Sequence, residues 1–220
     1  MITLDPDSPL SPSEVVLLRC DQFASKAKWE SDGLLHLEIK YFPGLAQAML
    51  TTAFLANEQV GALRLEVRQK KARLGLGQAQ VLFAEPVGTS GWPAHSPEAE
   101  LCAIAAQLKA NTGNNEVANV VYAWLKVDFM YPAMVVVEAV KSGLAERGLL
   151  QVINKQVKMF LVRKVNAHGH VLLPATAALA AQQPVATIQQ LLAETERDRP
   201  EVWRSLVDGI MEALRRRTKD

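Results

Sequence analysis

The sequence predicts a mainly α-helical protein, a compact multi-helix domain that carries two short β-hairpins. Two observations favour this fold class. Apolar residues recur at helical spacing in several stretches that begin with a capping residue or a proline. In addition, one helix–glycine–hairpin unit is used twice, over residues 45–84 and 135–165. We therefore expect a binding protein more than an enzyme.

The composition is that of an ordinary globular protein. The chain has 220 residues, enough for one large domain or two small ones, with 49% hydrophobic and 21% charged residues. A formal net charge of +1 argues against a globally basic nucleic-acid binder, so any anion site must be a local patch. Cys20 and Cys102 are expected to be buried free thiols, with a disulfide as the alternative.

The sequence indicates neither a signal peptide nor a membrane-spanning segment. The N-terminus is acidic and proline-rich and does not have the cationic start and apolar core of a signal peptide. Nor does any run approach the roughly 18 apolar residues that span a bilayer. We expect a cytoplasmic protein that can be peripheral on a membrane. Residues 1–10 are predicted to be a flexible segment, 11–217 a single helical domain that could divide at 86–95, and 218–220 a tail.

Local signals place the first elements. Ser11, followed by Pro12 and Glu14, is a helix-start signal and predicts a helix over residues 14–20. Residues 34–40 alternate between apolar and polar, which fits either a short strand or the edge of a loop.

The first helix–glycine–hairpin unit follows. An apolar helix is predicted over residues 45–57, and Gly61 suits the turn that leaves it. Residues 62–68 alternate cleanly and predict a strand, a turn is expected at 69–71, and residues 72–84 return.

The middle of the chain contains a loop and two helices. Residues 86–93 are rich in glycine and proline and predict the loop. Ser96 caps a helix expected over 98–110, in which Glu98 is explained as a favourable charge at the helix start. Residues 116–129 are predicted to form the next helix.

The second unit repeats the first. It comprises a helix over 135–146, a turn at Gly148, a strand over 149–153, a turn at 154–156 and a strand over 157–165. A further turn is expected at 167–170. The chain then continues with three predicted helices, at 174–182, 184–196 and 200–217.

Catalytic and metal-binding motifs are not found. The sequence has neither a glycine-rich phosphate loop nor a Gly-x-Ser-x-Gly elbow. His168 and His170 flank a glycine, where a solvated turn is favoured over a two-histidine metal clip. We therefore predict no enzymatic activity, no cofactor and no metal. Trp124 and Trp203 are expected in the core, and Trp92, in a loop, is expected to be the most exposed tryptophan.

The candidate site is the basic surface of the two hairpins. Lysine and arginine there can bind phosphates of nucleic acids or of anionic lipids through the same electrostatics. The alternative is that these charges protect edge strands from aggregation. The candidate residues are Arg64, Arg68, Lys70, Lys71 and Arg73 in the first hairpin and Lys155, Lys158, Arg163 and Lys164 in the second.

Three stretches resemble the Golgi phosphoprotein 3 family, which also has bacterial members. They are SEVVLL at residues 13–18, GLAQAML at 44–50 running on to GALRL at 61–65, and VKSGLAERGLL at 140–150. The likeness covers most of residues 11–195. It implies a helical fold with short hairpins and a peripheral membrane protein. Eukaryotic members of the family bind phosphatidylinositol 4-phosphate and sort glycosyltransferases.

The headgroup pocket of that family uses one tryptophan and three arginines. By our matching, these positions are held here by Leu37, Ala46, Met134 and Val137. Uncharged side chains do not supply the charge-assisted hydrogen bonds that a phosphate needs. What the resemblance implies for this chain is therefore the fold and membrane association through the basic hairpins.

We thus expect a non-catalytic binding or adaptor protein whose partner is an anionic membrane surface or another protein. The alternative is a tandem winged-helix module that binds nucleic acid or protein. Base readout needs polar or basic residues on the recognition helix. Residues 45–57 contain no lysine or arginine, and residues 135–146 contain only Lys141. The sequence leaves the oligomeric state open.

Overall fold

The computed structural model describes residues 4–71, 78–159 and 163–218, and the side chains of these residues except Lys71 and residues 154–168. Within this part, eight α-helices and three two-stranded antiparallel sheets confirm the mainly helical fold with short hairpins. The helices are α1 (Pro12–Leu18), α2 (Phe42–Gln59), α3 (Pro97–Thr112), α4 (Val117–Leu125), α5 (Pro132–Glu146), α6 (Pro174–Ala181), α7 (Val185–Asp198) and α8 (Pro200–Arg217).

Short elements complete the architecture. The 3-10 helices are η1 (Cys20–Gln22) and η2 (Ile39–Tyr41). The sheets pair β1 (Lys28–Trp29) with β2 (Leu35–His36), β3 (Leu63–Lys71) with β4 (Gln78–Pro86), and β5 (Leu150–Met159) with β6 (Arg163–Leu172). The stretch 34–40, which fitted a strand or a loop edge, is divided between β2 and η2.

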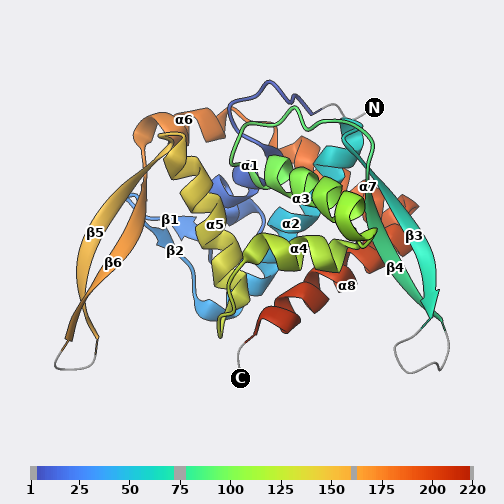
Figure 1. Cartoon of the computed structure of the whole chain (residues 1–220). Helices are drawn as coiled ribbons and strands as arrows, with labels where there is room; N and C mark the ends of the chain where they lie inside the picture. The colour runs from blue at the N-terminus through green and yellow to red at the C-terminus, as the bar shows by residue number, and fades with distance from the viewer. Residues whose placement is uncertain (1–3, 72–77, 160–162, 219–220) are drawn as a thin grey trace.

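Helix α2 is the centre of the molecule. Glu58 is its single charged residue, and apolar or small side chains lie on every side of it. A helix that is apolar all round is stable only when it is enclosed. Accordingly, α2 packs against α1, α3, α5, α7 and α8 (Figure 1). The fully buried Leu45, Met49 and Phe54 lie in one continuous hydrophobic core that includes residues from both sides of the loop at 86–95.

The helix–glycine–hairpin unit is indeed used twice, with the same junction. Gly61 and Gly148 have φ angles of +75° and +73°, in the left-handed region where glycine is favoured. After each glycine, the next backbone N–H donates to a carbonyl five residues earlier, Ala62 to Asn57 and Leu149 to Leu144, both at 2.9 Å. This is the bond pattern of a Schellman helix end. Each junction therefore directs the chain from a buried helix into a hairpin.

Both hairpins are longer than the sequence predicted. The expected turns at 69–71 and 154–156 are wrong, because β3 continues to Lys71 and β5 to Met159. The expected turn at 167–170 is also wrong. Asn154 pairs with His168, so the polar residues assigned to two turns face one another in a continuous ladder. Cross-strand pairing has overridden the local turn preference of asparagine and glycine.

Three corrections concern burial and helix ends. Trp92 is only 5% exposed and belongs to the core, although it lies in a loop and was expected outside. The helix expected over 116–129 ends at Leu125, and Lys126 follows with a φ of +57°. Within the segment expected to be flexible, Leu4 and Leu10 are buried. By contrast, Trp124 and Trp203 contact the core as predicted, and Cys20 and Cys102 are buried free thiols.

The two hairpins flank the helical body on opposite sides. Both run from one end of the molecule toward the end where the C-terminus and the loop between α4 and α5 lie (Figure 1). We call this end the base. The N-terminal segment crosses the opposite end. No helix among the described residues is both long and apolar enough to cross a bilayer.

Candidate functional site

The described cations of the first hairpin are held in ion pairs. Arg64 Nε lies 2.5 Å from Glu66 Oε1, and Arg68 Nη2 lies 2.5 Å from Glu66 and 2.6 Å from Glu85. Lys70 pairs with Glu116. The backbone places Lys71 at the end of β3, and Arg73 lies outside the described residues. The first hairpin is thus closer to charge balance than its lysine and arginine count suggests.

Two of the neutralising carboxylates come from outside the strand that bears the cations. Glu85 is the cross-strand partner of Arg64, and Glu116 precedes α4. Burial opposes ionisation of Glu85, but hydrogen bonds from Lys109 and Asn115 and the nearby charge of Arg68 hold its pKa below its usual range. A correct prediction of the β3–β4 register would have placed Glu85 opposite Arg64 and so indicated it as a partner of the basic residues. No local pattern in the sequence points to Glu116.

In the second hairpin, the basic positions gather toward the distal end of the ladder. Lys158 pairs with Lys164, and Met159 pairs with Arg163, at the last two described rungs. Lys155 lies three residues nearer the helical body, opposite Ala167. Residues 150–173 contain no aspartate or glutamate. The second hairpin therefore carries its positive charge without a carboxylate of its own, unlike the first.

An exposed apolar surface at the base was not predicted from the sequence. We call Ile39, Val127, Phe129, Met130, Tyr131 and Met211 the apolar patch; each is at least 41% exposed. The described residues contain eight exposed large apolar side chains, and six of them lie here. Isolated surface apolar residues are normal, but a concentration of them usually marks an interaction site. The patch is therefore the strongest candidate site of the molecule.

A groove of about 300 Å³ opens within the apolar patch. Its wall is formed by the starts of α2 and α5 and by the last turns of α8. Among the described residues that line it, Arg215 is the one with a charge. The lining residues outside the patch are Phe42, Pro43, Pro132, Ala133, Leu214, Arg215 and Thr218.

Arg217 fixes the loop that bears most of the patch. Its guanidinium donates to Tyr122 O at 2.6 and 3.0 Å and to Asp128 Oδ1 at 2.8 Å, and it lies 3.6 Å from the centre of the Tyr122 ring. The Phe129 N–H in turn donates to Arg217 O at 3.0 Å. The end of α8 and residues 126–131 are thus one rigid unit, which explains how apolar side chains remain exposed there.

Several cations surround the patch. Lys126 is exposed at its edge. Lys40 and Arg215 are also largely exposed, and they pair with Glu38 at 2.9 Å and Glu212 at 2.8 Å. These pairs lie at the surface, where ion pairs are weak and exchange readily. With Glu38 and Glu212 beside Lys40 and Arg215, the described charges around the patch nearly balance, and Lys126 is the exposed cation that an incoming anionic group would meet.

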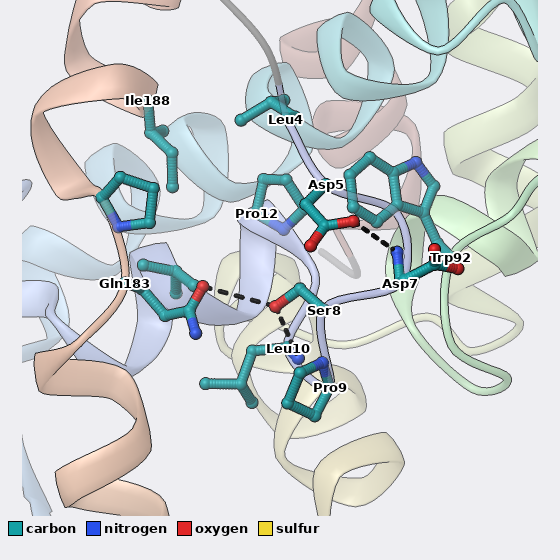
Figure 2. A pocket seen from close by; sticks show the side chains of 12 residues that line it. Leu4, Asp5, Asp7, Ser8, Pro9, Leu10, Pro12, Trp92, Gln183 and Ile188 are labelled. Atoms are coloured by element: carbon teal, nitrogen blue, oxygen red, sulfur yellow. Dashed lines mark hydrogen bonds between the residues drawn. The ribbon is translucent and has the colours of Figure 1, made fainter.

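A second cavity, of about 320 Å³, lies at the opposite end, where the N-terminal segment meets α1 and the start of α7. We call it the N-terminal pocket. Its floor is apolar and includes Leu10, Ile188 and the ring edge of Trp92 (Figure 2). Asp5 Oδ1 accepts from the Asp7 N–H at 3.0 Å, and Ser8 Oγ donates to Gln183 Oε1 at 3.3 Å (Figure 2).

Side chains suited to metal binding are not assembled in the described part of the chain. No set of three or more histidine, cysteine, aspartate or glutamate side chains is placed there to hold a metal ion. Burial raises the pKa of Cys20 to about 12, and burial also raises that of Cys102, so both thiols are protonated at neutral pH.

The winged-helix alternative has little support in this geometry. Helix α2 would be the first recognition helix, but it is enclosed by five other helices. Helix α5 buries one face, and of its residues only Ser142 and Glu146 are exposed. The positions matched to a headgroup pocket are also occupied by packed side chains. Ala46 and Val137 are fully buried, and Leu37 and Met134 pack against the core.

Comparison with protein-family models finds no match to this chain, and comparisons with curated proteins and with solved structures find none either. The inference of function therefore rests on the geometry described above.

Proposed function

We propose that the protein is a non-catalytic binding or adaptor protein that attaches to anionic membrane surfaces through its base. The observation that carries this proposal is the apolar patch, which lies at the end of the molecule toward which both basic hairpins extend (Figure 1). In this arrangement, apolar side chains enter the headgroup region while hairpin cations lie near lipid phosphates on either side.

The apolar contribution is the larger one. Burying an exposed Phe or Met side chain contributes roughly 1.5–3 kcal/mol. Phe129, Met130 and Tyr131 are adjacent at the tip of a fixed loop, so they can enter an interface together without ordering the chain first. Aromatic residues are also favoured at membrane interfaces.

The cations contribute the preference for anionic lipid. Each lysine or arginine near such a surface contributes about 1 kcal/mol, and salt screens this attraction. Lys126 at the patch and the distal residues of the second hairpin are the candidates for this role. This proposal agrees with the peripheral membrane association that the resemblance to the Golgi phosphoprotein 3 family implies, and membership of that family is part of the proposal.

The test is co-sedimentation with vesicles of phosphatidylcholine alone and of phosphatidylcholine mixed with phosphatidylserine, at low and at physiological salt. The wild type is expected to bind the anionic vesicles and to bind them less at higher salt. The double variant Phe129→Ser, Met130→Ser should lower the apparent affinity at least about tenfold, given the apolar area removed.

Val87→Ser is the matched control, because Val87 is 61% exposed but lies outside the patch. It should bind like the wild type. The proposal would be refuted if the wild type bound neither vesicle type, or if the double variant bound as well as Val87→Ser. A DNA shift assay and a measurement of oligomeric state run beside it would show whether the hairpins bind nucleic acid or the patch joins two copies instead.

A further inference from the structure

Two carboxyl groups meet in the interior where the starts of α1 and α3 cross. Glu14 and Glu98 are both completely buried. Glu98 Oε1 accepts from the Ser13 N–H at 2.7 Å, and Glu98 Oε2 lies 2.8 Å from Ser13 Oγ. Glu14 Oε2 accepts from the Ser11 N–H at 2.9 Å. Glu98 was explained from the sequence as a favourable charge at a helix start, but its carboxyl group is buried and accepts hydrogen bonds from the start of α1.

In the described part of the chain, one cation contacts this pair. Arg147, at the end of α5, donates to Glu14 Oε1 and, at 3.0 Å, to Pro9 O. From α2 the cluster receives only the neutral amide of Asn57, which donates to Glu98 O at 2.8 Å. Just before α3, His95 pairs at the surface with Glu146 at the end of α5, away from the buried cluster. Two buried carboxylates with one guanidinium would leave one negative charge unbalanced.

The geometry shows which carboxyl group takes a proton. Burial raises the pKa of Glu14, but Arg147 lies directly against it and opposes this shift. Glu98 has only hydroxyl and amide partners, and burial raises its pKa to about 7. Protonated, Glu98 can donate to Ser13 Oγ, and Ser13 Oγ can donate to Ser11 Oγ, 3.5 Å away. Arg147 thus favours the ionised form of Glu14, whereas Glu98 has no cation against it and is the group better placed to hold a proton.

This cluster also fastens the N-terminal segment. Arg147 holds Pro9 O, and Glu14 caps Ser11, immediately after Leu10. Leu4, Leu10 and Pro12 form part of the lining of the N-terminal pocket (Figure 2). Glu14 holds Ser11, and the residues on either side of Ser11, Leu10 and Pro12, line the pocket. A displacement of the Glu14 carboxyl group would therefore also displace this part of the pocket wall.

We propose that Glu14 and Glu98 form a pH-sensitive latch that holds one proton when the N-terminal segment is packed, and that loss of this proton loosens the first turn of α1 and one wall of the N-terminal pocket. The packed state binds the proton more tightly than the unfolded chain does. Stability should therefore fall as pH rises from about 4.5 to about 7 and then remain low.

The test is urea unfolding of the wild type and of Glu98→Gln between pH 5.5 and 8.5. For a carboxyl group whose pKa rises from 4.5 to about 7 on folding, the unfolding constant should increase about 30-fold over this range. The amide of glutamine, like the protonated carboxyl group, can accept from the Ser13 N–H and donate to Ser13 Oγ, so Glu98→Gln should lose this part of the pH dependence. Glu201→Gln is the matched control, because Glu201 also follows a helix-starting proline but is exposed.

Histidines ordinarily change charge in the same range. The difference between wild type and Glu98→Gln therefore decides the outcome, rather than the wild-type slope alone. Equal slopes for these two proteins would overturn the latch. Hydrogen exchange of residues 11–18, corrected for the intrinsic rate, should accelerate above pH 7 in the wild type but not in Glu98→Gln.

Should Glu98→Gln fail to fold, carbon-13 NMR of the wild-type glutamate carboxyl groups gives the answer directly. One carboxyl group titrating near pH 7 supports the latch, and titration of every glutamate below pH 5.5 overturns it.

Discussion

Arg217 shows how one side chain can keep an apolar surface exposed. Its guanidinium makes three hydrogen bonds and stacks on Tyr122, while its own carbonyl receives the Phe129 N–H. Arginine suits this position because its planar fork can donate in several directions while its face lies on a ring. These contacts hold the loop that carries Phe129 and Met130 against the end of α8, so its apolar side chains stay at the surface and do not pack into the core.

We therefore expect Arg217→Ala to lower the free energy of unfolding by about 2 kcal/mol, because it leaves Tyr122 O and Asp128 without their donor in a partly buried place. Arg217→Lys should recover little of this loss, since an ammonium group cannot replace the fork and the stacking. Urea unfolding measures both. Arg215→Ala is the control, because the exposed pair of Arg215 with Glu212 contributes only a few tenths of a kcal/mol. Equal losses for Arg217→Ala and Arg215→Ala would contradict this role.

At the scale of elements, the two hairpins share a junction but differ in charge. Both follow a buried helix and a left-handed glycine. In the first, Arg64, Arg68 and Lys70 face Glu66, Glu85 and Glu116. In the second, the strands have no acidic residue. One of these pairs, Lys70–Glu116, joins the first hairpin to the residue before α4, whereas the cations of the second have no carboxylate on their own strands.

This difference predicts unequal contributions to vesicle binding. The double variant Lys155→Ala, Lys158→Ala should weaken binding to anionic vesicles about tenfold or more, at about 1 kcal/mol for each lysine. Lys70→Ala, Lys71→Ala, with the same change in net charge, should weaken it less, because Lys70 already pairs with Glu116. Co-sedimentation at low salt compares the two. If binding persists when all four lysines are replaced, the hairpins take no part in it.

The sequence predicts elements well where the signal is local. The Ser96 cap, whose Oγ accepts from the Ala99 N–H at 3.2 Å, and both glycine junctions are as expected. Prediction from the sequence fails where contacts with residues distant in the chain determine the structure. The polar triplet at 154–156 is strand because residues 166–168 face it, and Trp92 is buried because other elements cover its loop. The sequence does not predict the apolar patch, because residues 116–129 indicate one continuous helix, whereas α4 ends at Leu125 and a loop follows.

At the scale of the whole molecule, the two candidate sites lie at opposite ends. The apolar patch is at the base, and the N-terminal pocket with its buried carboxyl pair is where the N-terminal segment crosses the helices (Figure 1). Changes at distant sites that share no partners usually have additive effects. One site can therefore be altered without changing the chemistry of the other.

We accordingly expect Glu98→Gln to bind anionic vesicles with the affinity of the wild type at pH 6, where Glu98 is largely protonated. Phe129→Ser, Met130→Ser should in turn keep the wild-type pH dependence of unfolding. Both follow from the separation of the sites, and both use the assays described above. A vesicle affinity that changes with Glu98→Gln at this pH would show that the two ends communicate.

The enclosure of α2 also has a consequence for how the chain is made. Residues 44–57 contain no charged side chain, and they leave the ribosome before α3, α5, α7 and α8, all of which cover them. Until α8 has been synthesised, part of this helix has nothing but solvent or another molecule against it. Nascent chains that stall before that point would expose an apolar surface to chaperones and to one another. The helix that lies at the centre of the folded protein is therefore a segment prone to aggregation while synthesis is incomplete.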